Sequence, residues 1–441
     1  MPLFPGAAER QDDSRQQTSS DDIDPKEGTE NSGQTDHPDS DEQAAPEETS
    51  HQRGGPSETT PSVTQEPEPV LIQLAAVGDL LMHRPITDGG LVNPDTDPPA
   101  YDFRPNFKFI KASIMQADEA IFNLETTLAG PPYTGYPRFS APDAVAEALL
   151  DTGFTLASTA NNHILDKDQE GFFRTTKVLR DFGFHVIGTR LSTDEPRDII
   201  LDISGIITAF TAYTFETPGT PSQRTLNSLP IPDEIHPLLN SFNPYRQEAY
   251  EADLERMLEH IEDMKLRGAE LICMSIHWGE EYQTESRPYQ REMAQKLADA
   301  GVQVIFGHHP HVLQEIDILV SAKTGESTVV YYSLGNLVTN MTNEVPHAAG
   351  WSQDSMIARV VIQKDNEGVK LVQAQYVPAH IIRVPEPQGR RHYVVPVLPA
   401  LEEPESFYTT REVMRKSLER INQVMKSIPE DGPVPIRQVP R

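Results

Sequence analysis

Short apolar runs that stop at polar clusters constrain the fold of this 441-residue chain more than any other feature. The run over 70–77 ends at Gly78-Asp79, and similar pairs of a run and a cluster recur as far as Asn336. Helical patterns separate most of the runs, and strands dominate after residue 312. Such alternation with short connections favours parallel sheets, whereas the late hairpins indicate antiparallel strands. We predict an α/β fold, a two-sheet α/β/β/α sandwich.

The polar clusters follow predicted strands, which is where open α/β sheets bind ligands. Alone, the Gly-Asp pair 78–79 is typical of a turn, and the Asn-Asn-His stretch 161–163 of a loop with a helix cap. His277, at the end of a strand, is equally compatible with a buried structural histidine. The His-His-Pro-His stretch 308–311 has no packing rationale and indicates a metal or phosphate site.

Together the clusters supply a mixed set of carboxylate, amide and imidazole groups: Asp79, Glu125, Asn162, His277, His309 and His311. Such a set suits Mn²⁺, Zn²⁺ or Fe²⁺ better than Ca²⁺, which prefers oxygen ligands alone. Six candidate ligands are enough for one ion or two. Paired ions can activate a nucleophile and stabilise a departing oxygen. His163 would then act as the general acid or stabilise the oxyanion.

The two ends of the chain differ from the middle. Residues 1–69 are acidic and polar and contain few apolar side chains, so they bury too little surface to fold, and we predict a disordered acidic tail. A tether is the simplest role for it, and an acidic docking arm is the alternative. The folded domain is predicted over 70–384. A C-terminal extension over 385–441 contains one amphipathic helix, 405–428, that packs outside the domain or extends away.

Less regular patterns lie inside the predicted domain. We predict a helix over 107–120, a β-hairpin over 199–213 and a long loop over the Pro-, Ser- and Asn-rich residues 214–245.

Charge argues against one class of partner, and hydropathy argues against a membrane-spanning segment. The formal net charge of −30 argues against nucleic acid, because phosphate binding needs a basic face. The apolar runs are far shorter than the roughly 18–20 residues that a spanning helix needs, so no transmembrane segment is predicted. The N-terminal residues lack the basic and apolar parts of a signal peptide.

In their order along the chain, the clusters resemble the CapA/PgsA family of poly-γ-glutamate capsule proteins, whose fold is similar to that of calcineurin-like metallophosphoesterases. The resemblance covers roughly residues 72–340. The stretches that carry it are Val77 to Asp79, Asn123 to Glu125, Phe139 to Pro142, Ala160 to Asp166, His277 to Tyr282, Gly307 to Val312 and Ser333 to Asn336.

The resemblance implies roles for particular residues. The six candidate ligands fall where metallophosphoesterases place metal ligands, and His163 falls on their catalytic histidine. His308 is an alternative ligand to His309. Residues of the same motifs, and one arginine between them, are assigned to substrate binding: Asn123, Asn161, Arg138, Trp278, Glu281 and His308.

This chain departs from the phosphoesterase pattern at two points and from the CapA pattern at a third. Phosphoesterases usually begin with Asp-x-His, but here three residues separate Asp79 from His83, so His83 is predicted not to reach the metal. Their second motif is usually Gly-Asp, where this chain has Asn-Leu-Glu ending at Glu125. Lys167-Asp168 replaces the aromatic residue and glycine that the CapA family often has, which predicts a reshaped loop.

Two functions from different classes follow. The resemblance implies a component of poly-γ-glutamate capsule synthesis, export or anchoring, with the anionic polymer or the capsule synthase components as partners. It also implies a membrane-associated location outside the cytoplasm, although no signal or anchor is predicted in this sequence. The ligand set indicates a metal-dependent hydrolase, which would cleave a phosphoester or an amide in this or another substrate.

Overall fold

The computed structural model describes residues 68–341, 350–387, 389–428 and 432–441. These residues belong to one compact unit. The acidic tail predicted over 1–69 lies outside the described residues, except for its last two positions. Within the described ranges, no helix is long and apolar enough to cross a membrane.

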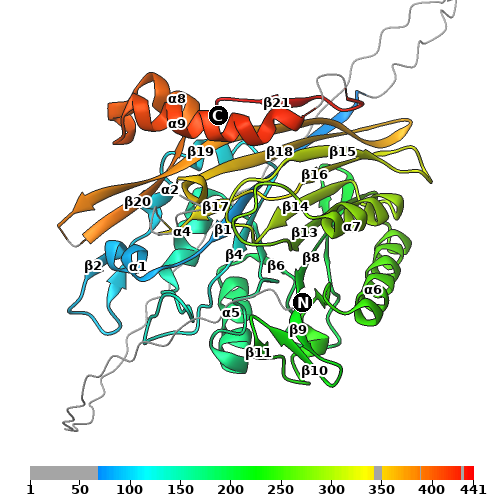
Figure 1. Ribbon diagram of the computed structural model, residues 1–441, viewed down its shortest axis with the longest axis horizontal. Helices are drawn as coiled ribbons and strands as arrows, with labels where there is room; N and C mark the ends of the chain where they lie inside the picture. Colours follow the sequence, from blue (N-terminus) through cyan, green and yellow to red (C-terminus); the bar gives the residue numbers. More distant parts are fainter. Residues whose placement is uncertain (1–67, 342–349, 388, 429–431) are drawn as a thin grey trace, which may run out of the picture. The chain divides into compact units, whose positions relative to one another are not determined.

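The first of two large mixed sheets is built around the opening strand of the domain, β1 (Val70–Leu80). Its strand order is β20-β19-β18-β1-β4-β5-β6, parallel from β1 to β6 and antiparallel from β1 to β20 (Figure 1). β17 pairs with the end of β1, and β21 pairs with β19. The bounds are β4 (Glu119–Leu124), β5 (Leu156–Ser158), β6 (His185–Ile187), β17 (Asn336–Val338), β18 (Asp354–Asp365), β19 (Gly368–Glu386), β20 (Gly389–Pro396) and β21 (Ile436–Gln438).

The second sheet has the order β12-β8-β13-β14-β16-β15, with β7 paired to β8. β12, β8, β13, β14 and β16 are parallel, whereas β7 and β15 are antiparallel edges. The predicted hairpin over 199–213 corresponds to β7 and β8. The bounds are β7 (Ile199–Ile203), β8 (Ile206–Phe215), β12 (Ser241–Phe242), β13 (Leu271–His277), β14 (Val304–His308), β15 (Ile316–Val320) and β16 (Ser327–Tyr331).

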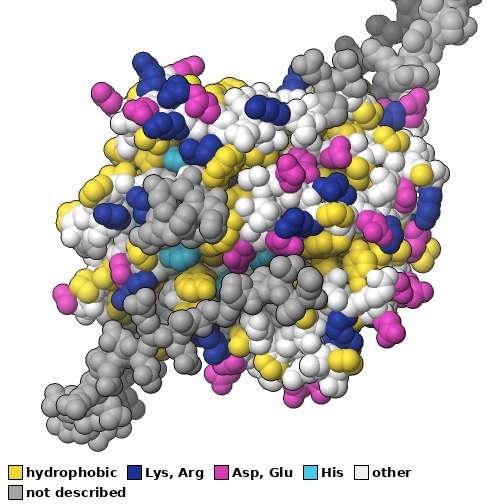
Figure 2. Space-filling view, viewed as in Figure 1, with side chains coloured by type: hydrophobic (Ala, Val, Ile, Leu, Met, Phe, Trp, Pro, Cys, Tyr) yellow, Lys and Arg dark blue, Asp and Glu magenta, His cyan; other side chains and the backbone are white. Residues whose placement is uncertain are grey.

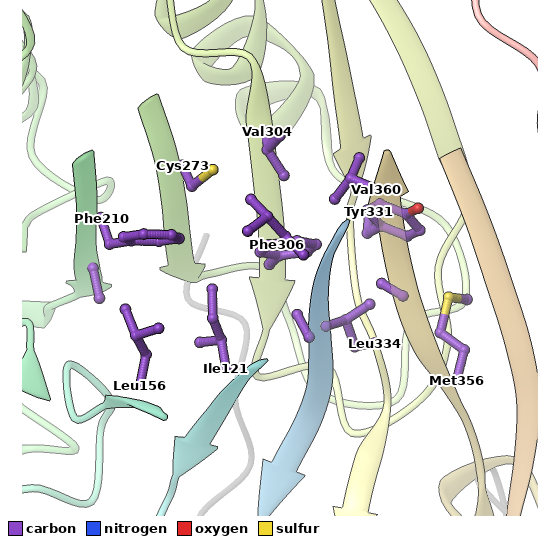
Figure 3. Packing of buried hydrophobic residues seen from close by; sticks show 14 of the residues in the cluster. Ile121, Leu156, Phe210, Cys273, Val304, Phe306, Tyr331, Leu334, Met356 and Val360 are labelled. Atoms are coloured by element: carbon purple, nitrogen blue, oxygen red, sulfur yellow. The ribbon is translucent and has the colours of Figure 1, made fainter. Parts of the chain in front are cut away.

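The two sheets pack face to face, and apolar side chains fill the space between them. Figure 3 shows Phe210, Cys273 and Phe306 from the second sheet pointing toward Ile121 and Leu156 from the first. The central strands are buried on both faces, which explains their continuous apolar sequence.

Helices cover both outer faces. Side chains from α1, α2, α3, α4 and α5 pack in the cluster on the outer face of the first sheet. Side chains from α6 and α7 pack on the outer face of the second sheet (Figure 1). The predicted α/β/β/α sandwich is therefore confirmed. The bounds are α1 (Arg84–Gly90), α2 (Arg104–Phe107), α3 (Lys111–Ile114), α4 (Ala144–Thr152), α5 (Asp168–Asp181), α6 (Gln247–Leu266) and α7 (Pro288–Asp299).

Two local predictions were wrong. The helix predicted over 107–120 is broken into the short helices α2 and α3, and between them the chain turns so that Lys108 lies over the rings of Phe109, Tyr393 and Tyr408. The loop predicted over 214–245 contains a three-stranded sheet, with β9 (Thr217–Thr220), β10 (Gln223–Leu226) and β11 (Leu229–Pro230).

Long-range ion pairs anchor this three-stranded sheet. Arg224 bridges the fully buried carboxylates of Glu216 and Asp253, each at 2.8 Å. Asp253 lies on α6, so the contact that orders this segment comes from outside it and leaves no local pattern in the sequence.

The C-terminal residues continue the first sheet. The predicted boundary at residue 385 falls inside β19, and β20 and β21 both pair with that strand. Two further helices, α8 (Val397–Glu402) and α9 (Arg411–Val424), follow β20. α9 buries Met414 and Ile421 in the cluster between the sheets, so this helix packs on the domain and does not extend away.

Candidate metal centre

The candidate site lies where the two sheets come together at the ends of β1, β4, β13 and β14. Two glycines allow this approach. A Cβ on Gly78 would lie 2.0 Å from the carbonyl oxygen of Gly335, and a Cβ on Gly307 would lie 2.0 Å from that of Tyr332. The Gly335 carbonyl oxygen also accepts the Asp79 backbone N–H at 2.9 Å. The glycines that precede Asp79 and His308 therefore bring the two motifs together.

Asp79 is the centre of the hydrogen-bond network. Its carboxylate is fully buried and accepts the Asn123 amide at 2.8 Å and the His309 backbone N–H at 3.0 Å. Imidazole nitrogens of His308 and His311 lie 3.1 and 3.3 Å away. Burial alone would raise the pKa of Asp79, but the contacts with His308 and His311 outweigh it and hold the pKa well below its usual value. Asp79 is therefore charged.

Glu125 contrasts with Asp79. It is also fully buried, yet neither carboxylate oxygen has a hydrogen-bond partner among the described residues. The nearest imidazole nitrogens belong to His277 at 3.5 Å and His311 at 3.7 Å, and both distances are longer than hydrogen bonds. Burial raises the pKa of Glu125 to about 8. A buried carboxyl group without partners is costly, and a bound cation would compensate it.

The three imidazoles surround Glu125. Burial lowers the pKa of both His277 and His309 well below the usual value, which keeps these rings neutral, the form that ligates metals. Burial also disfavours the charged form of His311, but Glu125 and Asp79 outweigh it and raise its pKa to about 10. Asn162 fixes the His277 ring, with its side-chain oxygen 2.7 Å from Nε2.

The backbone of the histidine loop adopts rare conformations. His309 and His311 have φ values of 95° and 56°, a region that residues other than glycine seldom occupy. Such conformations cost on the order of 1–3 kcal/mol each and cluster at functional sites. In this conformation both rings offer a nitrogen to the same ligand set.

The geometry fits a metal ion. In three sets, each side chain offers one ligand atom that lies within 4.8 Å of the atoms of the other two members. Unpartnered buried atoms occur in the same place, namely both Glu125 oxygens, His309 Nδ1 and His308 Nε2. The sets are Glu125, His277 and His309; Asp79, Glu125 and His311; and Glu281, His309 and His311.

His163 lies beside this cluster in a pair with Asp166. Its Nδ1 is 2.8 Å from the Asp166 carboxylate, which also accepts the Phe139 backbone N–H at 2.7 Å. Burial lowers the pKa of His163, but the contact with Asp166 outweighs it and the pKa is raised. Because Asp166 engages Nδ1, proton transfer by His163 would run through Nε2.

Sequence reasoning missed two residues of the site. Asp166 orients His163, and its only signal is its place at the end of the stretch 160–166. Asn336 holds His311 from two sides, with its side-chain oxygen 3.1 Å from Nδ1 and its amide donating to the His311 carbonyl oxygen at 2.9 Å. The available signal for Asn336 was its place at the end of the polar cluster 333–336, which follows the apolar run 329–332.

The residues predicted to bind substrate lie in different places. Asn123 and Asn161 are buried within the network, and Asn161 donates to the Leu124 carbonyl oxygen at 2.8 Å. His308 is buried against Asp79, so it supports a ligand. Arg138 is partly exposed and pairs with Asp168 at 2.9 Å, and Glu281 is exposed beside the histidines.

Trp278 is not brought to the site. Its side chain is fully buried among the residues beneath α6 and α7, and its indole N–H donates to the Tyr332 carbonyl oxygen at 3.0 Å. The motif therefore uses Trp278 for packing.

His83, predicted not to reach the metal, accepts the Asn340 N–H at 3.3 Å and lies against the Phe139 ring.

Comparison with known proteins gives the family. The model described as "Bacterial capsule synthesis protein PGA_cap" matches residues 73–341, more than half of the chain. This chain belongs to that family. The matched range contains every residue of the three ligand sets, together with His163 and Asp166.

Two relatives carry related names. The Capsule biosynthesis protein CapA of Bacillus anthracis is 24% identical over 319 residues, which cover 70% of this chain and 67% of that protein. The PGA biosynthesis protein CapA of Bacillus subtilis (strain 168) is 26% identical over 275 residues, covering 58% of this chain and 63% of that protein. This chain thus spans about two thirds of the length of the relatives it matches.

The chain is also similar to a solved structure. The crystal structure of TT1561 of Thermus thermophilus has a TM-score of 0.30 and 10% identity, and the alignment covers 65% of this chain and 94% of that one. The sandwich fold follows from the two sheets themselves.

Proposed function

We propose that this domain binds one or two divalent transition-metal ions and acts as a metal-dependent hydrolase on an anionic polymer of the poly-γ-glutamate type during capsule synthesis. The observation that carries the proposal is Glu125, a fully buried carboxyl group with two unpartnered oxygens between His277 and His311. Without a cation, burying this carboxyl group destabilises the fold, and no hydrogen bond within the protein compensates for it.

The ions would be held by the side chains of the three ligand sets, with Glu125 shared between two of the sets. Mixed imidazole and carboxylate ligands suit Mn²⁺, Zn²⁺ or Fe²⁺. When bound, such ions polarise a scissile carbonyl or phosphoryl oxygen and lower the pKa of water. Asp79 orients His308 and the backbone of His309.

His163 is the candidate proton donor to the leaving group. Its pKa is raised by Asp166, so it holds a proton more firmly than a free histidine does. Asp166 also fixes the ring with Nε2 as the transferring atom. Arg138 is held nearby through Asp166, whose backbone carbonyl oxygen accepts the guanidinium at 2.5 Å. Arg138, which also pairs with Asp168, is the candidate positive group for contact with a substrate carboxylate.

The capsule substrate is supported by the family and by the names of the two CapA relatives. The chain itself is acidic, with a formal net charge of −30, so a polyanion would be repelled without local positive charge. Figure 2 shows Lys and Arg side chains interspersed with Asp and Glu on the face that it views, with no extended basic patch among the residues described there. Bound cations would supply the missing charge.

An alternative is a metal-dependent hydrolase for a phosphoester or another amide. The same cluster favours it, because the metal ligands and the pair of His163 with Asp166 contain nothing specific to a γ-glutamyl bond. The location outside the cytoplasm, and capsule synthase components as partners, stay predictions.

Metal content tests the proposal first. The full chain, purified without chelators and incubated with Mn²⁺ or Zn²⁺, should retain one or two equivalents by mass spectrometry. Asp79→Ala and His309→Ala should lose them. His185→Ala is the matched control, since His185 is exposed at the start of β6. An unloaded wild-type chain would overturn the metal centre.

The second step separates the substrates. Loaded wild-type protein is incubated with γ-glutamyl oligomers, phosphomonoesters and phosphodiesters, and His163→Ala serves as the catalytic control. Cleavage of γ-glutamyl oligomers that falls at least ~100-fold in His163→Ala supports the proposal. Cleavage of phosphoesters alone would favour the alternative, and metal content without any turnover would leave only a binding role.

A further inference from the structure

Glu281 differs from every other member of the ligand sets because it is exposed. It shares one set with His309 and His311, in which the three ligand atoms lie within 4.8 Å of one another. The other sets contain only buried residues and share Glu125. One carboxyl group thus reaches the histidine pair from the interior and another from the solvent side.

The backbone holds Glu281 in this place. The next residue, Tyr282, donates its N–H to the Pro310 carbonyl oxygen at 2.8 Å, between the two histidines. Tyr282 has a φ of 63°, which turns the chain sharply at this contact. On the other side, the Gly279 N–H donates to the Tyr289 hydroxyl at 2.6 Å. The loop that carries Glu281 is therefore tied to the loop that carries His309 and His311.

The neighbouring glutamate has a different environment. Glu280 pairs with Arg287 and its side chain is 53% exposed. Glu281 belongs to a ligand set, while Glu280 belongs to none among the described residues. Two adjacent carboxylates on one loop therefore face different partners, and only one of them is positioned toward the imidazoles.

We propose that Glu281 is a metal ligand at the mouth of the centre, joining the cation positions of His309 and His311 from the solvent side. This inference rests on the proposed metal centre and assigns Glu281 to cation binding, where the sequence predicted a substrate contact. Imidazole with carboxylate is a donor set for a divalent transition metal.

Charge explains what this ligand contributes. With Asp79 and Glu125, Glu281 makes three carboxylates, and one divalent cation leaves the group net negative when all three are ionised. Two divalent cations make it net positive. A third carboxylate therefore favours a second cation, and the doubly loaded centre attracts an anionic substrate. Because Glu281 is exposed, the cation it helps to hold should exchange faster than one held by buried ligands alone.

Cation binding tests the assignment without an activity readout. The full chain is stripped with a chelator and titrated with Mn²⁺, and separately with Zn²⁺, by calorimetry. Glu281→Gln should weaken at least one equivalent by about tenfold or more, and Glu281→Asp should show a smaller loss of affinity. Glu280→Gln, the matched control, should stay within about twofold of wild type.

The outcomes separate this inference from the proposed function. Wild-type protein that binds no cation would overturn both. Wild-type binding that Glu281→Gln leaves unchanged, and Glu125→Gln abolishes, would overturn the role of Glu281 and keep the metal centre. Equal losses in Glu280→Gln and Glu281→Gln would show a general electrostatic effect of the loop and would also overturn the assignment.

Discussion

Two buried carboxylates in this domain have opposite surroundings. Asp354, at the start of β18, accepts the His380 ring at 2.7 Å, the Ser417 hydroxyl at 2.6 Å and the Arg420 guanidinium at 2.5 and 2.9 Å. Both of its oxygens are satisfied. Glu125, at the end of β4, is more deeply buried and has no hydrogen-bond partner on either oxygen among the described residues.

The difference separates a structural cluster from a functional one. Asp354 ties α9 to β18 and β19, so its contacts hold the C-terminal helix on the sheet. Glu125 links no elements of the protein, because the nearest imidazole nitrogens, of His277 and His311, are too far away for hydrogen bonds. A buried charge that is fully paired stabilises one arrangement, whereas a buried group left unpaired indicates a ligand that comes from outside.

The largest effect on folding is expected at Asp354. Asp354→Ala leaves Arg420 without its buried counter-charge and the His380 ring without its hydrogen-bond partner, and breaking a buried ion pair costs about 3–5 kcal/mol of the free energy of unfolding. Urea unfolding of metal-free protein measures it. Asp181→Ala, at an exposed pair with Lys177, is the control and should change the free energy by less than about 1 kcal/mol. Equal losses of unfolding free energy in Asp354→Ala and Asp181→Ala would show that Asp354 is not a structural centre.

The next effect is stabilisation by cations. A cation at about 100 times its Kd should raise the free energy of unfolding of the wild-type chain by about 2.7 kcal/mol, because it binds only the folded state. Glu125→Gln should lose this gain, and Asp181→Ala should keep it. Thermal or urea unfolding with and without Mn²⁺ gives the result, and a gain retained in Glu125→Gln would count against its role as a ligand.

Without cations, Glu125→Gln should change the free energy of unfolding by less than about 1 kcal/mol, in either direction, since no protein contact is lost. The comparison with Asp354→Ala is made in metal-free protein by the same urea titration. A loss as large as that of Asp354→Ala would show that Glu125 is a structural group after all.

The smallest effect concerns the protonation of His163. Asp166→Asn should lower the pKa of His163, because the carboxylate that raises it is gone. In the wild type, the stabilisation from this pair is fully present below the unfolded-state pKa of about 6.5 and is lost as the pH rises through the raised folded-state pKa. NMR titration of the His163 ring in metal-free protein checks the shift, and an unchanged pKa would contradict the pairing.

Much of the fold and of the site could be predicted from the sequence. Apolar runs that end in polar residues placed Asp79, Glu125 and His277 at strand ends, and parallel strands bring such ends together at one edge. The motif of three histidines stood out because no packing role explains it. These signals are local, so they can be recognised in the sequence without knowledge of the tertiary structure.

Other features depend on contacts that no local pattern records. The strands between residues 217 and 230 are ordered by Arg224 and its partner Asp253 on α6. Trp278 lies in the core, where its indole N–H donates to the Tyr332 carbonyl oxygen, 54 residues further along the chain. Asp354 and Arg420 meet across 66 residues, which is why the C-terminal helix was not predicted to be part of the domain.

X-ray absorption spectroscopy at the edge of the bound metal tests the central claim most directly. The loaded full chain should show a mixed shell of imidazole nitrogen and carboxylate oxygen, and His309→Ala should lose part of the imidazole scattering, with His277 and His311 still present, or the metal itself. The same chain with His185→Ala should match the wild type. A shell made of oxygen alone, or a wild-type chain that retains no metal, would contradict the account.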